Sequence, residues 1–163
     1  MAGKKKHATG TPATLALEEA GVPFTLHSYE HDPRNQNFGM EAAEALGFAP
    51  ERVFKTLMVQ LPDGLAVGIV PVDGTLDLKA IAAALGHKKA QMADPAAAQR
   101  RTGYVLGGIS PLGQRQHSPT VLDDSALRHA TVLVSGGRRG LDVELAPEDL
   151  IRLTGAATAP IRA

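Results

Sequence analysis

Residues 53–70 read VFKTLMVQLPDGLAVGIV, in which two β-branched runs flank the turn sequence Pro62-Asp63-Gly64. Two such runs joined by a short turn predict a β-hairpin. Alternate residues of a strand share a face, and both faces of the first run, Val53–Val59, are mainly apolar. We therefore expect the hairpin to be covered on both sides, with Lys55 interrupting an otherwise apolar row.

Helices and further strands are predicted on both sides of this hairpin. Capping residues and apolar periodicity predict helices over residues 12–20, 39–46, 78–85, 95–101 and 147–154. Residues 24–29, 120–122, 131–135 and 141–145 are expected to form strands. The two kinds of element are interspersed without strict βαβ alternation, which predicts an α+β fold with a mixed sheet.

Length and composition narrow the class of protein. With 163 residues we expect a flexible N-terminal tail over residues 1–10 and a single domain over residues 11–163. The 17 Lys and Arg residues balance 17 Asp and Glu residues, which disfavours a strongly cationic nucleic-acid binder. The absence of cysteine excludes disulfides, thiolate metal sites and a cysteine nucleophile. Without a signal peptide or an eighteen-residue apolar window, the chain is expected to be cytoplasmic.

Three familiar motifs are incomplete. Lys55-Thr56 resembles the end of a phosphate-binding P-loop, but both glycines of that motif are missing. The sequence around Ser110 comes near a nucleophile elbow, but it lacks the final glycine and has proline after the serine. His27 and His31 would lie about 13 Å apart along a strand, too far to share one metal ion. We therefore expect neither a metal nor a cofactor.

Two other segments have the composition of a binding site. Lys55 has two interpretations. It is either a cation in a pocket wall that binds a phosphate or a developing oxyanion, or a structural lysine that reaches solvent or pairs with a carboxylate. Residues 103–113 include four glycines, whose exposed N–H groups could form an oxyanion hole. An ordinary surface loop has the same composition, so both interpretations stay open.

A predicted hairpin over residues 131–145 is the third candidate. Arg138 and Arg139 at its turn would meet either phosphate or solvent. Ser135, at a strand end, is a candidate hydrogen-bonding residue. Asp142 and Glu144 alternate with apolar residues, so they line the solvent face unless that face is a cleft.

Eight short motifs together resemble the YbaK/EbsC family, in order and spacing, from about Pro12 to Leu153. These motifs are Tyr29-Glu30-His31-Asp32-Pro33, Phe38-Gly39, Phe54-Lys55-Thr56-Leu57, Met92-Ala93-Asp94, Thr102-Gly103-Tyr104, Gly107-Gly108-Ile109-Ser110-Pro111-Leu112-Gly113-Gln114, Val134-Ser135-Gly136-Gly137 and Arg139-Gly140-Leu141-Asp142. Each motif alone is weak evidence, whereas the set is highly specific.

The resemblance implies a mixed, partly barrel-like β-sheet flanked by helices. It also implies hydrolysis of the ester between a mischarged amino acid and the 3′-terminal adenosine of a tRNA. The branch with this Gly-Gly-Ile-Ser-Pro-Leu-Gly string acts on cysteinyl-tRNA(Pro), in trans and in a transient complex with prolyl-tRNA synthetase. In that branch the thiol of the substrate attacks its own carbonyl and leaves a thiolactone.

The resemblance also assigns roles to residues. It implies catalytic roles for Lys55, Gly107 and Gly108, and substrate-binding roles for Tyr29, Phe38, Thr56, Ser135 and Asp142. The expected tRNA contacts are the local basic clusters, namely Lys88, Lys89, Arg100, Arg101, Arg138 and Arg139. Because Arg115-Gln116-His117 is less basic than is usual in the family, and the net charge is zero, we expect weak tRNA binding, with the synthetase holding the tRNA.

Other functions remain compatible with the same residues. An ordered water could hydrolyse alanyl-tRNA(Pro) or another mischarged tRNA. A noncatalytic module could bind the tRNA 3′ end or a nucleotide. A general esterase fits less well because the usual catalytic constellation is missing, and we expect no membrane or DNA partner.

Overall fold

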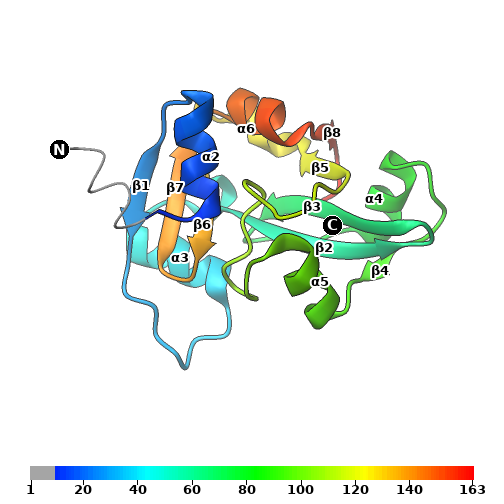
Figure 1. The fold of residues 1–163 in the computed structure, drawn as a ribbon, viewed down its shortest axis with the longest axis horizontal. Coiled ribbons are helices and arrows are strands. Elements are labelled where there is room, and N and C mark those ends of the chain that lie inside the picture. Colours follow the sequence, from blue (N-terminus) through cyan, green and yellow to red (C-terminus); the bar gives the residue numbers. More distant parts are fainter. Residues whose placement is uncertain (1–9) are drawn as a thin grey trace.

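The computed structural model describes residues 10–163, and the rest of the expected tail lies outside these residues. The smaller of its two sheets is antiparallel and has the order β1-β7-β6. Its strands are β1 (Thr25–Ser28), β7 (Leu141–Leu145) and β6 (Val132–Arg138). Figure 1 shows this sheet at one end of the molecule and the long hairpin of the larger sheet extending toward the other.

The larger sheet has the order β4-β2-β3-β5-β8. Its strands are β4 (Gln91–Met92), β2 (Phe54–Leu61), β3 (Gly64–Pro71), β5 (Thr120–Asp123) and β8 (Ala157–Ala159). β2 is antiparallel to β3 and β4, whereas β5 is parallel to β3 and β8. The sheet is therefore mixed, and the predicted α+β class is confirmed.

The expected barrel-like closure is not confirmed. Within residues 10–163 the two sheets stay separate, and a single parallel bridge, Val53 to Leu133, joins β2 to β6. Strands that pair at one point only must diverge beyond it. The two sheets therefore form a wedge that opens away from this bridge.

The helices agree closely with the capping signals. They are α2 (Pro12–Ala20), α3 (Phe38–Leu46), α4 (Leu78–Ala84), α5 (Pro95–Thr102) and α6 (Pro147–Thr154), with 3-10 turns η1 (Pro50–Arg52) and η2 (Asp124–Arg128). Thr11 and Thr14 form a capping box at the start of α2, and the carboxylates of Asp77 and Asp94 cap α4 and α5.

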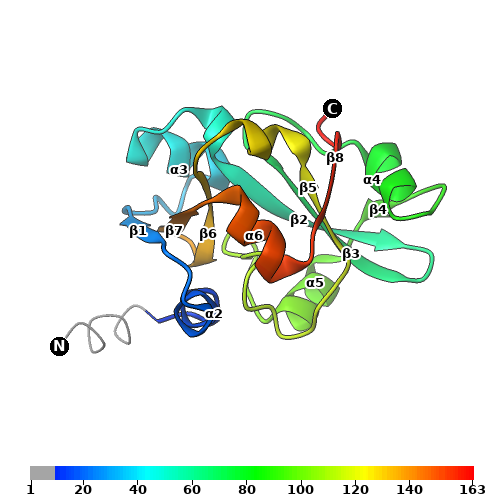
Figure 2. The ribbon, with the colours of Figure 1, turned by 90° about the horizontal axis from the view of Figure 1, so that it is seen from above.

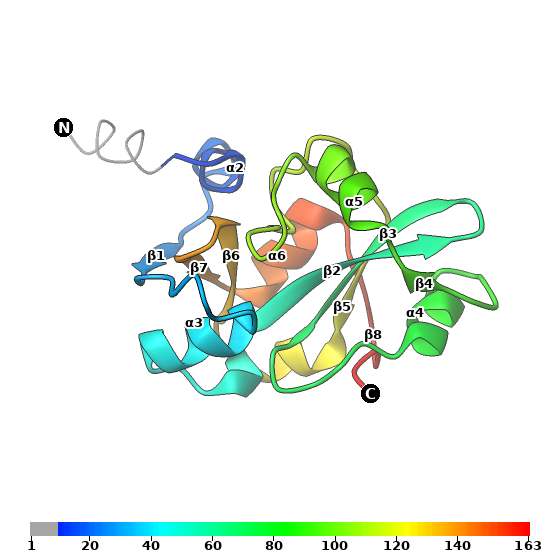
Figure 3. The same cartoon turned by 90° about the horizontal axis from the view of Figure 1, so that it is seen from below.

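The hairpin β2–β3 is covered on both faces, as predicted. Phe54 and Met58 pack into the main core, which fills the space between the two sheets together with α2, α5 and α6. Val59 packs on the other face with Ile81 of α4. Figure 2 shows α6 lying over the middle of the molecule, and Figure 3 shows β2 passing between α3 and α5. No helix in residues 10–163 is long and apolar enough to cross a membrane.

Candidate functional site

A cavity of about 490 Å³ lies along β2 where the two sheets diverge. Six consecutive residues, Val53–Met58, line it. Because successive side chains of a strand point to opposite faces, a cavity that touches all six must run along the edge of the strand. The start of α3, the start of α5 and the glycine-rich loop complete its walls.

The main chain of β2 is open along this edge. The C=O of Val53 accepts from Val72 of the β3 side, whereas the C=O of Met58 accepts from Ala93 beside β4. Since main-chain groups alternate between the two sides of an antiparallel strand, those of Thr56 point away from β3, as those of Met58 do. β4 pairs with Val59 and Gln60 only. In the described residues no strand pairs with Thr56 on that side, so its N–H and C=O face the cavity.

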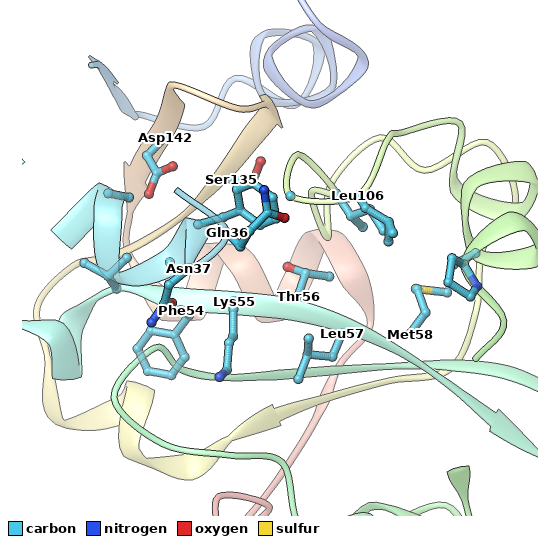
Figure 4. Close-up of a pocket in the computed structure, with 18 of the residues that line it drawn as sticks. Gln36, Asn37, Phe54, Lys55, Thr56, Leu57, Met58, Leu106, Ser135 and Asp142 are labelled. Atoms are coloured by element: carbon cyan, nitrogen blue, oxygen red, sulfur yellow. The ribbon is translucent and has the colours of Figure 1, made fainter. Parts of the chain in front are cut away.

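Lys55 and Thr56 project from opposite faces of β2 (Figure 4). Thr56 lies on the side where Ser135 and Asp142 are found, and its Oγ1 is buried without a hydrogen-bond partner in the described chain. Lys55 extends from the other face beside Leu57. Burial lowers the pKa of its ammonium, and the charge of Asp73 opposes this shift. Lys55 therefore borders the cavity from the face of β2 opposite to Thr56.

The two central glycines of the loop differ in their surroundings. Gly107 lines the cavity with φ +81°, and a Cβ there would collide with the Phe38 ring and Arg139. Gly108 does not line the cavity, and its N–H donates to Val105 O at 3.0 Å. The expected oxyanion donor at Gly108 is thus already engaged, which leaves Gly107 as the glycine of this pair that faces a ligand.

Ser135 and Asp142 are opposite each other in the register of β6 and β7. The Ser135 Oγ accepts a hydrogen bond from the N–H of Gly137 at 3.1 Å. Asp142 is 6% exposed, and burial raises the pKa of its carboxyl to about 7. Of the two alternatives left open by the sequence, a solvent-exposed face or a cleft, the structure therefore shows a cleft at Asp142.

Tyr29 reaches the same cavity from the end of β1. Its burial, followed by the nearby charge of Asp142, raises the pKa of the phenol to about 12. Tyr29 is therefore a neutral hydroxyl near pH 7.

Phe38 of α3 lines the cavity, and its ring contacts the guanidinium of Arg139 and the ring of His31. Arg139 lies over its ring at 4.7 Å, and the His31 ring lies 5.7 Å away on a tilted plane. His31 is held in place by Glu41, whose Oε1 is 2.7 Å from Nδ1. His27 is likewise paired, with Glu144 at 2.8 Å. Among residues 10–163 no group of three or more potential ligands is arranged for a metal ion.

The cavity brings together most of the residues expected at a site. Lys55, Gly107, Tyr29, Phe38, Thr56, Ser135 and Asp142 line it, and Gly108 lies outside. Sequence reasoning missed several further lining residues, among them Asn37 and the exposed apolar residues Met92 and Leu106. Asn37 is the N-cap of α3, a structural role that does not indicate a site. Met92 and Leu106 are apolar side chains at a strand and a loop position, and such residues are common on surfaces.

The basic residues expected to contact tRNA belong to three separate parts of the chain, namely the segment before β4, the end of α5 and the end of β6 with the turn after it. Lys88, Lys89, Arg100 and Arg138 are exposed. Arg101 is instead engaged by Ser118, Gln116 and the carbonyl of His117. Arg139 donates through Nε to Leu106 O at 2.9 Å, and its terminal nitrogens have no partner within residues 10–163.

The family model for the aminoacyl-tRNA editing domain matches residues 39–153. A protein of Enterococcus faecalis named "Putative Cys-tRNA(Pro)/Cys-tRNA(Cys) deacylase EbsC" is 38% identical over 160 residues, which cover 97% of this chain and 96% of that protein.

Two solved structures share the fold. One, described as a "putative trans-editing enzyme for prolyl tRNA synthetase", has a TM-score of 0.80 and 26% identity over 93% of this chain and 95% of its own. The other, a hypothetical protein, has a TM-score of 0.83 and 25% identity over 94% of this chain and 100% of its own. The likeness therefore extends over both sheets.

Proposed function

Because the chain belongs to the aminoacyl-tRNA editing domain family, we propose that it deacylates mischarged aminoacyl-tRNA, with cysteinyl-tRNA(Pro) as its substrate. The similarity to the E. faecalis protein, whose name specifies Cys-tRNA(Pro) and Cys-tRNA(Cys), supports this substrate class. The likeness to a structure described as a trans-editing enzyme supports action outside the synthetase.

The observation that carries the mechanism is the absence of an activated nucleophile among the residues that line the cavity. Its lining includes two aliphatic hydroxyls, Thr56 and Ser135, and no histidine. Within residues 10–163 neither hydroxyl is hydrogen-bonded to Asp142 or Lys55, the groups of the lining that could act as a base. Both histidines near the site are paired with carboxylates. Hydroxyl nucleophiles in esterases need an adjacent base. A nucleophile carried by the substrate, the cysteine thiol, is consistent with such a cavity.

The proposed reaction balances without a co-reactant. The sulfur of the substrate cysteine attacks its own ester carbonyl, a C–S bond forms and the C–O bond to the ribose breaks. The thiol proton ends on the ribose oxygen, so the products are a cysteine thiolactone and uncharged tRNA. Holding thiol and carbonyl in a reactive geometry can contribute on the order of 7–11 kcal/mol.

The residues of the cavity have positioning and electrostatic roles in this proposal. The N–H of Gly107 would stabilise the developing oxyanion. The ammonium of Lys55 would bind the phosphate of the terminal adenosine from the other side of the β2 edge. Tyr29, Phe38 and Thr56 would hold the ester in the wedge between the sheets.

The rest of the tRNA would be held weakly. We infer phosphate contacts at the exposed Lys88, Lys89, Arg100 and Arg138, with the terminal nitrogens of Arg139. The zero net charge supports a division of labour in which prolyl-tRNA synthetase retains the tRNA in a transient complex. Such a partnership would place the protein in the cytoplasm.

A deacylation panel tests the proposal. Cysteinyl-, seryl-, alanyl- and prolyl-tRNA(Pro), together with cysteinyl-tRNA(Cys), are incubated with the protein, with and without prolyl-tRNA synthetase. We expect cysteinyl-tRNA(Pro) to be cleaved and seryl-tRNA(Pro), which is isosteric but lacks the thiol, to react at least about a hundredfold more slowly. Comparable rates for the two would contradict thiol attack, and rapid cleavage of alanyl-tRNA(Pro) would favour an ordered water.

A further inference from the structure

Asp142 and Glu144 project from the same face of β7, yet their surroundings are opposite. Glu144 accepts from the hydroxyl of Thr131, and it lies 2.8 Å from His27 and 3.2 Å from Arg52. These partners, Thr131 and His27 foremost, lower the pKa of Glu144. Asp142 has neither a hydrogen bond nor an ion pair to its carboxyl within residues 10–163, although it is more deeply buried. Burial without a partner disfavours the charged form of a carboxyl group, which is why the pKa of Asp142 is raised.

The charged groups around Asp142 cannot supply its missing partner. His27, its register partner on β1, is turned to Glu144. Lys55 projects from the far face of β2, where Asp73 is the carboxylate whose charge acts on it. The remaining titratable neighbours, Tyr29 and Glu41, are acids. Within residues 10–163 no cation pairs with Asp142, which leaves its carboxyl free to bind a cationic group of a ligand.

We propose that Asp142 binds the α-ammonium group of the aminoacyl ester, with the Ser135 hydroxyl beside it as a second acceptor, so that the site selects esters of free amino acids over N-acylated ones. Every aminoacyl-tRNA carries this ammonium next to the ester carbonyl, and it is the cationic group of the amino-acid end. Fixing the ammonium also orients the carbonyl toward the β2 edge. This inference rests on the proposed function and adds the group that the site recognises.

The arrangement of donors and acceptors agrees with an ammonium rather than with a neutral ligand. An ammonium offers three N–H donors and no acceptor. Asp142 provides a carboxylate, and Ser135 lies directly across the hairpin, where opposite Cβ atoms are about 5 Å apart. In the free protein burial raises the pKa of Asp142 to about 7, and a bound ammonium would restore the ionised form.

The test compares cysteinyl-tRNA(Pro) with N-acetylcysteinyl-tRNA(Pro), which keeps the thiol and the ester but has no ammonium. In the unmodified protein we expect kcat/KM to be at least about 30-fold lower for the acetylated substrate, because one buried charge-assisted bond is lost. Asp142→Asn should lower kcat/KM for the cysteinyl substrate by a similar factor. Its kcat/KM for the acetylated substrate should stay within about threefold of that of the unmodified protein. Glu144→Gln, the matched carboxylate two residues away, should preserve the discrimination.

A binding measurement separates this inference from the reaction itself. Adenosine carrying cysteine through a non-hydrolysable 3′-amide, with a free or an acetylated amine, is titrated against the unmodified protein. We expect binding at least about tenfold tighter for the free amine. Equal binding, equal cleavage of both esters, or an equal loss for both in Asp142→Asn would overturn the inference. Failure to cleave any cysteinyl ester would instead overturn the proposed function, and the binding pair would still decide amine recognition.

Discussion

The guanidinium carbon of Arg139 lies 4.7 Å from the centroid of the Phe38 ring, at the mouth of the cavity. The same side chain donates through Nε to Leu106 O at 2.9 Å. Arg139 thereby joins the β6–β7 turn, the start of α3 and the glycine-rich loop. An exposed cation–π contact and a single hydrogen bond contribute about 1 kcal/mol each. The rim of the cavity therefore depends on one side chain and on contacts of modest energy.

Replacement of Arg139 tests whether its geometry or its charge matters. Arg139→Lys keeps the charge but loses the planar group that stacks on Phe38 and the Nε donor. We expect Arg139→Lys to raise KM for cysteinyl-tRNA(Pro) by about threefold, and Arg139→Ala, which also removes the phosphate contact inferred for the terminal nitrogens, by about tenfold. Steady-state kinetics at two salt concentrations measure this. If KM were unchanged in Arg139→Lys, the positive charge of Arg139 and not its planar geometry would be what substrate binding requires.

Thr56→Val should separate stability from activity. The hydroxyl of Thr56 is buried without a partner in the described chain, so its replacement by an isosteric methyl removes an unsatisfied group. We expect the free energy of unfolding to rise by about 1 kcal/mol, measured by urea denaturation, while kcat/KM falls by about tenfold. Thr56→Ser, which keeps the hydroxyl, is the matched control and should retain activity. A less stable Thr56→Val protein would contradict the unpaired state of the hydroxyl.

The elements could be predicted wherever their signals are local. The cap at Thr11, the turn Pro62-Asp63-Gly64 and the β-branched runs of β2 and β3 each lie within a few residues, and all three predictions are confirmed. β4 and β8 were missed because they have two and three residues, and only their neighbours make them strands. The two sheets meet at the Val53–Leu133 bridge, a long-range pairing that no local pattern reveals.

The residues of the candidate site were easier to find than their orientation. The motifs selected seven residues that line one cavity. The strand pattern places Lys55 and Thr56 on opposite faces of the strand, as the structure does. It could not tell that both residues border one cavity, because it does not say which edge of the strand is open. Nor could it separate Asp142 from Glu144, which have the same local pattern and differ only in their long-range partners.

Asp142 should make stability depend on pH. Its folded-state pKa of about 7 lies above the usual 3.8, so between about pH 4 and pH 7 the folded protein holds a proton that the unfolded chain has released. Stability from this group is therefore present below pH 4 and lost as the pH rises through 7. The free energy of unfolding of Asp142→Asn, taken relative to that of the unmodified protein, should therefore be higher at pH 8 than at pH 5, by an amount on the order of a few kcal/mol. Denaturant unfolding at both pH values measures this, and a gain that does not change with pH would contradict it.

Gly108→Ala should damage the junction of the glycine-rich loop with the β6–β7 turn. A Cβ at Gly108 would come within 2.8 Å of the Arg138 Cα, and main-chain atoms cannot move aside cheaply. We expect a loss of about 2 kcal/mol in the free energy of unfolding, together with lower activity. Gly74→Ala is the matched control, because the three atoms nearest to its Cβ belong to the flexible side chain of Arg162, whose movement would cost only a partly exposed ion pair with Asp73. Equal melting temperatures for the two variants would contradict this packing.

The open main-chain edge of β2 has a consequence for aggregation and for mutational tolerance. An unpaired strand edge on a surface invites another chain to extend the sheet. Here the open stretch is short, because the Val53–Leu133 bridge closes it at one end and the pairing of Val59 and Gln60 with β4 closes it at the other. The amide and carbonyl at this edge are also common to every residue type except proline, which lacks the N–H. Side-chain replacement can therefore tune this part of the cavity, but only proline at position 56 would delete its main-chain donor.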